Sequence, residues 1–242
     1  MTIRLETRMR GLVPLLLAAF VLAGCQAVPQ PPPGVDRTHP APAVPDTRPE
    51  GVTYAITDAS EVRIVIFAAG ELAHLGHPHV LAGAPVSGRV VVAEPFADSW
   101  LEASLPVAEL EADVPAWRVD EGFEPEIDPD DIRATIENMR SEAVLDAENH
   151  PTVRLESVGL RGPVWQPDLD LHITLRGTTR ALTVPVVLEL DDDRLVASGR
   201  LLLRQSEFGI EPFSALGGAL RVADEFLVRF RIEAERRFAN AD

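Results

Sequence analysis

Apolar and polar residues alternate with period two in one segment after another between residues 61 and 234. In residues 169–175, for example, Leu, Leu, Ile and Leu alternate with Asp, His and Thr. Successive side chains of a β-strand point to opposite faces, so this pattern predicts strands with one dry and one wet face. Such strands favour an antiparallel sheet of consecutive hairpins.

The number of such segments predicts an all-β fold in which about eight antiparallel, up-and-down strands close into a barrel. A flattened sandwich of two sheets is the alternative. Two polar segments between the alternating runs, Gly177-Thr178-Thr179-Arg180 and Asp191-Asp192-Asp193, predict hairpin turns.

One short helix interrupts the strands after Asp128. Asp128 is a suitable N-cap, and Pro129 suits the first helical position. The apolar residues Ile132, Ile136 and Met139 would share one face of this helix. The neighbouring acidic residues lack the ligand order of a calcium loop, so we interpret them as helix-capping residues.

The first 24 residues have the composition of a bacterial signal peptide. Arg4, Arg8 and Arg10 precede an apolar run over residues 11–23. That run is shorter than the approximately 20 residues of a transmembrane helix and contains Pro14. We therefore expect residues 1–24 to be removed.

Leu22-Ala23-Gly24-Cys25 resembles the lipobox of bacterial lipoproteins. The resemblance implies that Cys25 becomes the lipidated N-terminus and anchors the protein to a membrane of the cell envelope. Gln26 stands where lipoproteins of the inner membrane typically carry Asp, which favours the outer membrane, facing the periplasm. Cys25 is the only cysteine, so we expect no disulfide, thiol nucleophile or thiolate metal ligand in the mature protein.

Residues 25–50 comprise the lipidated cysteine and a segment rich in proline, which predicts an extended tether. Residues 51–242 are sufficient for a single domain with a sizeable core. The formal net charge is −16, and residues 1–24 carry three Arg and one Glu, a net +2, so the mature chain has −18. This acidic balance argues against nucleic acid as a partner.

Four segments of this domain resemble motifs of the YceI family. They are Tyr54-Ala55-Ile56-Thr57, the segment from Asn149 to Ser157, the segment from Leu175 to Val186, and the segment from Arg204 to Ile210. The resemblance implies a lipocalin-like barrel, periplasmic or secreted, that binds polyisoprenoids such as quinones or polyprenyl phosphates. Two departures are Glu207, where the family usually has Asp, and residues 74–83, which replace a family segment near the entry of the chain into the barrel and leave open where the polar end of the ligand lies.

The inward faces of the predicted strands are the candidate ligand site. A hollow barrel and an ordinary filled core predict the same residue types, and the family resemblance favours the cavity. The candidate ligand-binding residues are Leu101, Leu105, Val153, Leu155, Leu171, Ile173, Phe226 and Phe230. We expect no cofactor other than a bound isoprenoid lipid, and we leave the oligomeric state open.

Two other functional classes remain as alternatives. His74, His77 and His79 form a cluster that could bind zinc or copper, although we interpret it as a polar loop at the barrel mouth and predict no metal site. His150 would lead into a strand, and His172 would point outward. A barrel without a cavity could instead present its acidic surface to another protein. No nucleophile elbow, zinc-protease motif or nucleotide fingerprint occurs, so we do not expect an enzyme.

Overall fold

A computed structural model describes residue 44 and residues 47–237. Signal-peptide cleavage and lipidation were predicted for residues outside this part of the chain. The described strands form one antiparallel sheet. They are β1 (Val52–Ile56), β2 (Glu61–Ala69), β3 (His79–Ala82), β4 (Ser87–Val92), β5 (Trp100–Pro106), β6 (Glu111–Ala112), β7 (Thr152–Arg161), β8 (Asp168–Leu175), β9 (Thr178–Pro185), β10 (Val187–Leu190), β11 (Arg194–Arg204), β12 (Ser214–Ala215) and β13 (Leu220–Arg236).

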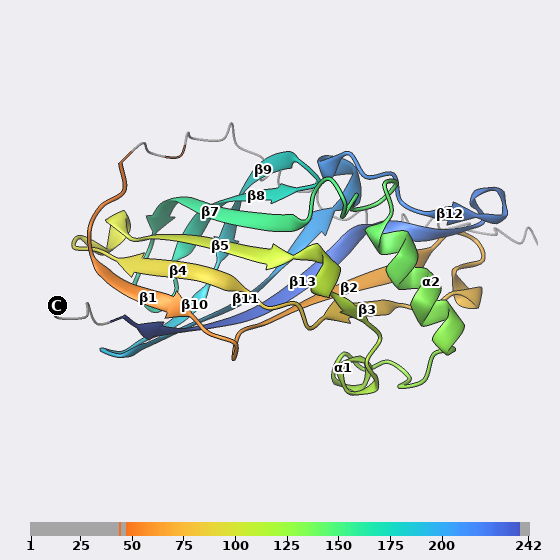
Figure 1. Cartoon of the computed structure of the whole chain (residues 1–242), viewed down its shortest axis with the longest axis horizontal. Helices are drawn as coiled ribbons and strands as arrows, with labels where there is room; N and C mark the ends of the chain where they lie inside the picture. The colour runs from red at the N-terminus through yellow and green to blue at the C-terminus, as the bar shows by residue number, and fades with distance from the viewer. Residues whose placement is uncertain (1–43, 45–46, 238–242) are drawn as a thin grey trace, which may run out of the picture. The chain divides into compact units, whose positions relative to one another are not determined.

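Eight of the strands follow one another around an incompletely closed barrel, in the order β11, β13, β1, β4, β5, β7, β8 and β9 (Figure 1). The run from β4 to β9 is up-and-down, as expected. The remaining described strands extend this ring rather than belonging to it: β2 continues β1 along β13, β3 and β6 follow β2, and β10 and β12 flank β11 and β13. The sheet therefore contains 13 strands, more than the sequence predicts.

The barrel is not closed by a continuous hydrogen-bonded ladder. β9 pairs with β8, and β11 pairs with β10 and β13. β9 also lies beside β11, but the described strands show no ladder between the two. A slit is therefore left where the ring would close.

The long strand β13 organises the sheet. One edge pairs with β11 from Glu225 to Glu235, and the other pairs with β1 and β2. Gly199 of β11 lies opposite Phe230, and a Cβ atom there would come within 2.7 Å of the Phe230 ring. Glycine thus permits this ring to lie against β11.

Two α-helices cover one end of the sheet, where the sequence predicts a single one. They are α1 (Pro115–Asp120) and α2 (Pro129–Arg140) (Figure 1). α2 begins as predicted: the Asp128 side chain accepts a hydrogen bond of 2.8 Å from the Asp130 amide. Met139 is buried against Leu81 and Leu105. Short 3-10 helices lie at Ala73–Leu75, Phe96–Asp98, Val107–Glu109, Gln205–Phe208 and Leu216–Gly218.

The predicted turns require one correction. Residues 191–193 connect β10 to β11, as expected. In the other segment, however, the turn is at Arg176-Gly177, and Thr178, Thr179 and Arg180 already belong to β9. Arg176 and Gly177 both have positive φ, which lets two residues reverse the chain and frees the threonines for the ladder. No described helix is long and apolar enough to cross a membrane.

Candidate functional site

The barrel encloses a cavity of about 230 Å³. Almost every side chain on its wall is aliphatic or aromatic, and the one hydroxyl there belongs to Ser99. That hydroxyl already accepts a hydrogen bond of 3.0 Å from the Ala93 amide. The described wall therefore offers no carboxylate, imidazole or free amine, and its chemistry suits an apolar guest.

All eight residues that the sequence predicts for ligand binding lie on the wall of this cavity. They are Leu101, Leu105, Val153, Leu155, Leu171, Ile173, Phe226 and Phe230. The register explains the agreement, since residues directly opposite each other in an antiparallel pair share a face. Leu155 pairs with Ile173, and Leu203 pairs with Phe226. That a ligand contacts these residues remains a prediction.

The cavity wall also contains residues that the sequence analysis did not select. Leu195, Leu201 and Leu203 of β11 follow the same alternation, so the pattern already contained the signal for them. Phe96 and Trp100 come from the connection between β4 and β5 and from the first residue of β5. Their position depends on how the chain turns at that end, which periodicity does not encode.

Trp100 is fixed by the segment that precedes β1. Its indole Nε1 donates a hydrogen bond of 2.9 Å to the Pro49 carbonyl. The guanidinium of Arg48 lies 4.7 Å from the Trp100 ring centroid, and that of Arg89 lies 5.0 Å away. Cation–π contacts of this kind hold an exposed ring by about 0.5–1 kcal/mol each. The segment before β1 thus packs against one end of the cavity wall.

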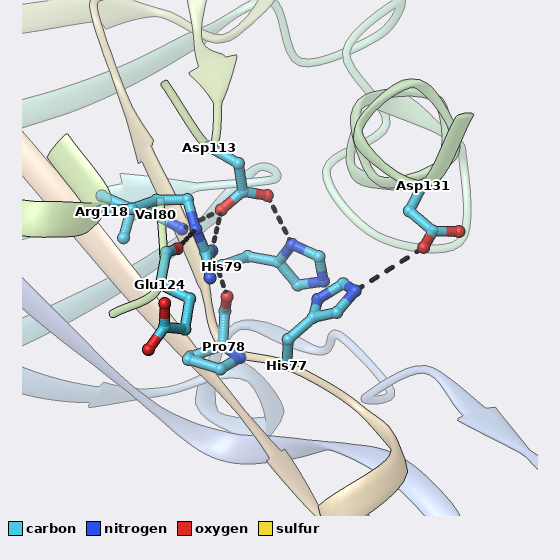
Figure 2. A network of polar contacts seen from close by, with 8 residues as sticks. All are labelled: His77, Pro78, His79, Val80, Asp113, Arg118, Glu124 and Asp131. Atoms are coloured by element: carbon cyan, nitrogen blue, oxygen red, sulfur yellow. Dashed lines mark hydrogen bonds and ion pairs between the residues drawn. The ribbon is translucent and has the colours of Figure 1, made fainter. Parts of the chain in front are cut away.

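A polar network joins residues around β3 and α1 (Figure 2), and none of its residues lines the cavity. Asp113 is 1% exposed, and Arg118 of α1 is 2% exposed. One oxygen of Asp113 accepts hydrogen bonds from Arg118, at 2.7 Å, and from the Val80 amide, at 3.0 Å. The other oxygen lies 2.6 Å from Nδ1 of His79. Arg118 also donates to the carbonyls of Pro78 and Glu124, so the network joins β3 to α1.

The pKa of Asp113 reflects two opposing effects. Burial of the carboxylate raises its pKa, but hydrogen bonds from His79 and the Val80 amide, with the charges around it, outweigh burial and lower the pKa below its ordinary value. Asp113 is therefore held as the anion. Because every contact of this carboxylate is to a group of the same domain, we interpret the network as structural.

The three clustered histidines occupy different environments. His79 is bound by Asp113, and the His77 ring packs edge-on against it with centroids 4.8 Å apart (Figure 2). His77 Nε2 lies 3.7 Å from Asp131 of α2, whereas His74 is exposed on a 3-10 helix. Within the described part of the chain, no three His, Cys, Asp or Glu side chains are arranged to hold a metal ion.

The other two predicted histidine positions are partly as expected. His150 immediately precedes the residues that lead into β7, and its Nε2 lies 3.9 Å from Asp146. His172 lies on the outward face of β8, as the alternation predicts, but its side chain is buried, with 9% exposure. It lies opposite Glu156 and Ala181 on the neighbouring strands.

Comparisons with known proteins agree with this architecture. A family model described as the YceI-like domain matches residues 56–234. The crystal structure of BcnA from Burkholderia cenocepacia is similar, with a TM-score of 0.55 and 17% identity over 74% of this chain and 99% of that chain. A YceI protein from Campylobacter jejuni gives a TM-score of 0.45 and 10% identity over 63% of this chain and 82% of that chain. No curated protein sequence matches this chain significantly.

Proposed function

The chain belongs to the YceI-like family, and from that premise we propose that the protein binds an apolar isoprenoid, such as a quinone or a polyprenyl lipid, inside its barrel. The single observation that carries this proposal is the cavity of about 230 Å³ with an apolar wall. An apolar cavity of about 150 Å³ already stays dry and accepts benzene. The larger space here suits a section of a slender hydrocarbon chain.

Binding would be driven by the burial of apolar surface, which contributes roughly 25 cal/mol per Å² before ordering costs. The wall would also select against polar solutes, because a hydroxyl or amide buried without a hydrogen-bond partner costs about 1–3 kcal/mol. We propose binding or carriage without chemical change, since the wall residues supply no acid–base pair or activated nucleophile.

We further propose that the protein works at a membrane of the cell envelope. The support is the lipobox-like segment ending at Cys25 and the proline-rich residues that follow it. Acylation by two or three chains gives a lasting anchor, whereas one chain binds only marginally. A tethered barrel of this kind could take its ligand from the membrane and hold it in the periplasm.

The test is native mass spectrometry of the full chain purified from membranes, for the wild type and for Leu155→Trp. Leu155 lines the cavity, so we expect a lipid mass on the wild type and its loss from the variant. The indole would occupy existing space, and the free energy of unfolding should change by less than the approximately 1–3 kcal/mol typical of an overpacked core.

Arg154→Trp is the matched control, because Arg154 is the exposed neighbour on the outward face of β7. This variant should retain the lipid. A wild type that carries no lipid, together with strong destabilisation of Leu155→Trp, would reject the proposal and leave a structural barrel. A metal mass in place of a lipid mass would favour the histidine cluster instead.

A further inference from the structure

The connection between β7 and β8 carries exposed apolar side chains. Trp165 is 65% exposed, and Val164 beside it is 44% exposed. The Trp165 carbonyl accepts a hydrogen bond of 3.1 Å from the Leu188 amide, which brings the start of β10, with the exposed Val187, beside this connection. These three residues, Val164, Trp165 and Val187, form what we name the tryptophan patch.

The two segments that form the tryptophan patch contain no charged residue. This is true of residues 162–167 and of residues 185–188, in a chain of which 25% of the residues are charged. The exposed acids Glu94 and Asp98 lie on the connection between β4 and β5, whose 3-10 helix contacts β7. A negatively charged partner would be repelled by these acids, whereas an apolar partner without net charge would suit the patch.

The tryptophan patch adjoins the wall of the ligand cavity. Pro167, which ends the connection, lines the cavity, and so do Leu188 and Leu160 of the strands on either side. Both α-helices lie elsewhere, against β3 and β6, where Met139 of α2 packs against Leu105 of the wall. The patch therefore stands at an end of the cavity that neither described α-helix covers.

The predicted tether joins the domain at this same end. Trp100, which lines the cavity, donates its indole hydrogen bond to the Pro49 carbonyl. The Arg48 guanidinium donates a hydrogen bond of 3.1 Å to the carbonyl of Ser157, near the end of β7. An extended chain spans about 3.1 Å per residue, so residues 26–46 can reach roughly 65 Å back to the predicted lipid anchor. This reach lets the patch lie on the bilayer that holds the anchor, with no part of the tether passing along the barrel.

We propose that the tryptophan patch is a membrane-docking surface, which inserts into a bilayer without net charge and sets this end of the cavity against the lipid phase. Tryptophan rings favour the interface between headgroups and acyl chains, and exposed apolar patches mark interaction sites. An apolar ligand would then pass between bilayer and cavity without entering water. The inference rests on the membrane location under the proposed function and names the surface that makes the contact.

Leu216 provides a matched control position. It is 66% exposed, as Trp165 is, but it precedes the first residue of β13, whereas the last residue of that long strand pairs with Tyr54. Figure 1 shows β12 and the start of β13 at the opposite end of the sheet from the end of β7. Leu216 does not line the cavity. A docking surface at the tryptophan patch therefore leaves Leu216 in water.

The test measures tryptophan fluorescence of the full chain, reconstituted through its anchor into phosphatidylcholine vesicles with and without brominated acyl chains, which quench nearby indoles. The brominated lipid should quench the wild type at least about twofold more than Trp165→Phe, because interfacial rings lie at the level of the headgroups. The double variant Trp165→Phe/Leu216→Trp has as many tryptophans as the wild type. It should be quenched no more than Trp165→Phe alone.

A charge in the patch tests insertion without removing the reporter. Val164→Asp should lower the quenching to the level of Trp165→Phe, whereas Leu216→Asp should leave it unchanged, with circular dichroism confirming the fold of both. Equal quenching of the wild type and Trp165→Phe, or strong quenching of the double variant, would overturn the docking surface and leave the lipid-binding proposal standing. Quenching that requires anionic lipid or disappears in added salt would also overturn it. A full chain that does not float with the vesicles would reject the proposed membrane location, and this inference with it.

Discussion

Asp113 is a buried carboxylate with hydrogen-bond partners on both of its oxygens. It is buried, and its two oxygens are occupied by Arg118, the Val80 amide and His79. Removing one partner from such a group leaves an uncompensated buried charge, which costs more than the intact pair contributes. The network therefore holds β3 and α1 in one arrangement.

Asp113→Asn should lower the free energy of unfolding by about 3–5 kcal/mol, because Arg118 would keep its charge without a counter-charge. Urea denaturation monitored by circular dichroism measures the change. Asp130→Asn is the control: Asp130 forms an exposed ion pair with Arg133 of the same helix, which should contribute less than about 1 kcal/mol. Similar small losses in the two variants would contradict the structural role of Asp113.

The stability that Asp113 contributes should also depend on pH. The folded-state pKa of Asp113 lies below that of the unfolded chain, where an aspartate has a pKa near 3.9. The carboxylate therefore contributes its full stability above about pH 4, and this contribution is lost as the pH falls through the folded-state pKa. The stability difference between wild type and Asp113→Asn should shrink as the pH falls below about 4. A difference that grows as the pH falls would show that folding does not lower the pKa of Asp113.

No sequence signal identified this network. His79 and Asp113 are 34 positions apart, and Arg118 lies on a helix of six residues that the sequence analysis did not predict. The sequence analysis selected the histidines because imidazole is a common metal ligand. Which groups they contact depends on how strands that are distant in the sequence lie in space. Local spacing could not distinguish a carboxylate-bound histidine from a metal ligand.

At the level of the elements, alternation located the strands well and their ends less well. The alternating run over residues 169–175 lies in β8, and the predicted inward residues outside this run lie in β5, β7 and β13. The sequence analysis assigned Thr178 to Arg180 to a turn because they follow a glycine between two alternating runs. In the structure these residues belong to β9 and pair with β8. Tertiary pairing overrides weak local preferences of this kind.

The buried face of α2 contributes to the stability of the protein, and its exposed face contributes little. Met139 is buried against Leu81 and Leu105, whereas Glu137 is exposed on the same helix. Met139→Ala should lower the free energy of unfolding by about 2–5 kcal/mol, through lost burial and the remaining void. Glu137→Ala should change it by less than about 0.5 kcal/mol. Thermal or urea denaturation measures both, and comparable losses would mean that the helix does not depend on this contact.

For the whole molecule, alternation predicted the wall of the cavity, whereas the cavity itself was expected only from the family resemblance. Period-two alternation places Leu155 and Ile173 on one face whether the barrel is hollow or filled. The volume that remains depends on how far apart opposite walls stand, which depends on strand number and pairing. The unpaired edges of β9 and β11 could not be predicted for the same reason.

The anchoring of the molecule gives a prediction outside the described residues. Cys25→Ser should block acylation and leave the protein unprocessed or soluble, with an unchanged fold, because Cys25 lies in a separate segment before the strands. Fractionation with a carbonate wash, together with circular dichroism, measures both properties. Retention of the variant in the washed membranes would show that the lipobox interpretation is wrong.

β13 pairs with β1, β2, β11 and β12, yet it follows all of them in the sequence. Its register joins Tyr54 to Arg236, residues from opposite ends of the described chain. Loop closure over such a distance makes folding slow, since the entropy is lost before the contacts form. Until β13 has been synthesised, β1, β2 and β11 lack their common partner, and open strand edges attract other chains. The nascent protein is thus most prone to aggregation just before its final strand is available, and a chain truncated before residue 220 would lose the barrel rather than one edge of it.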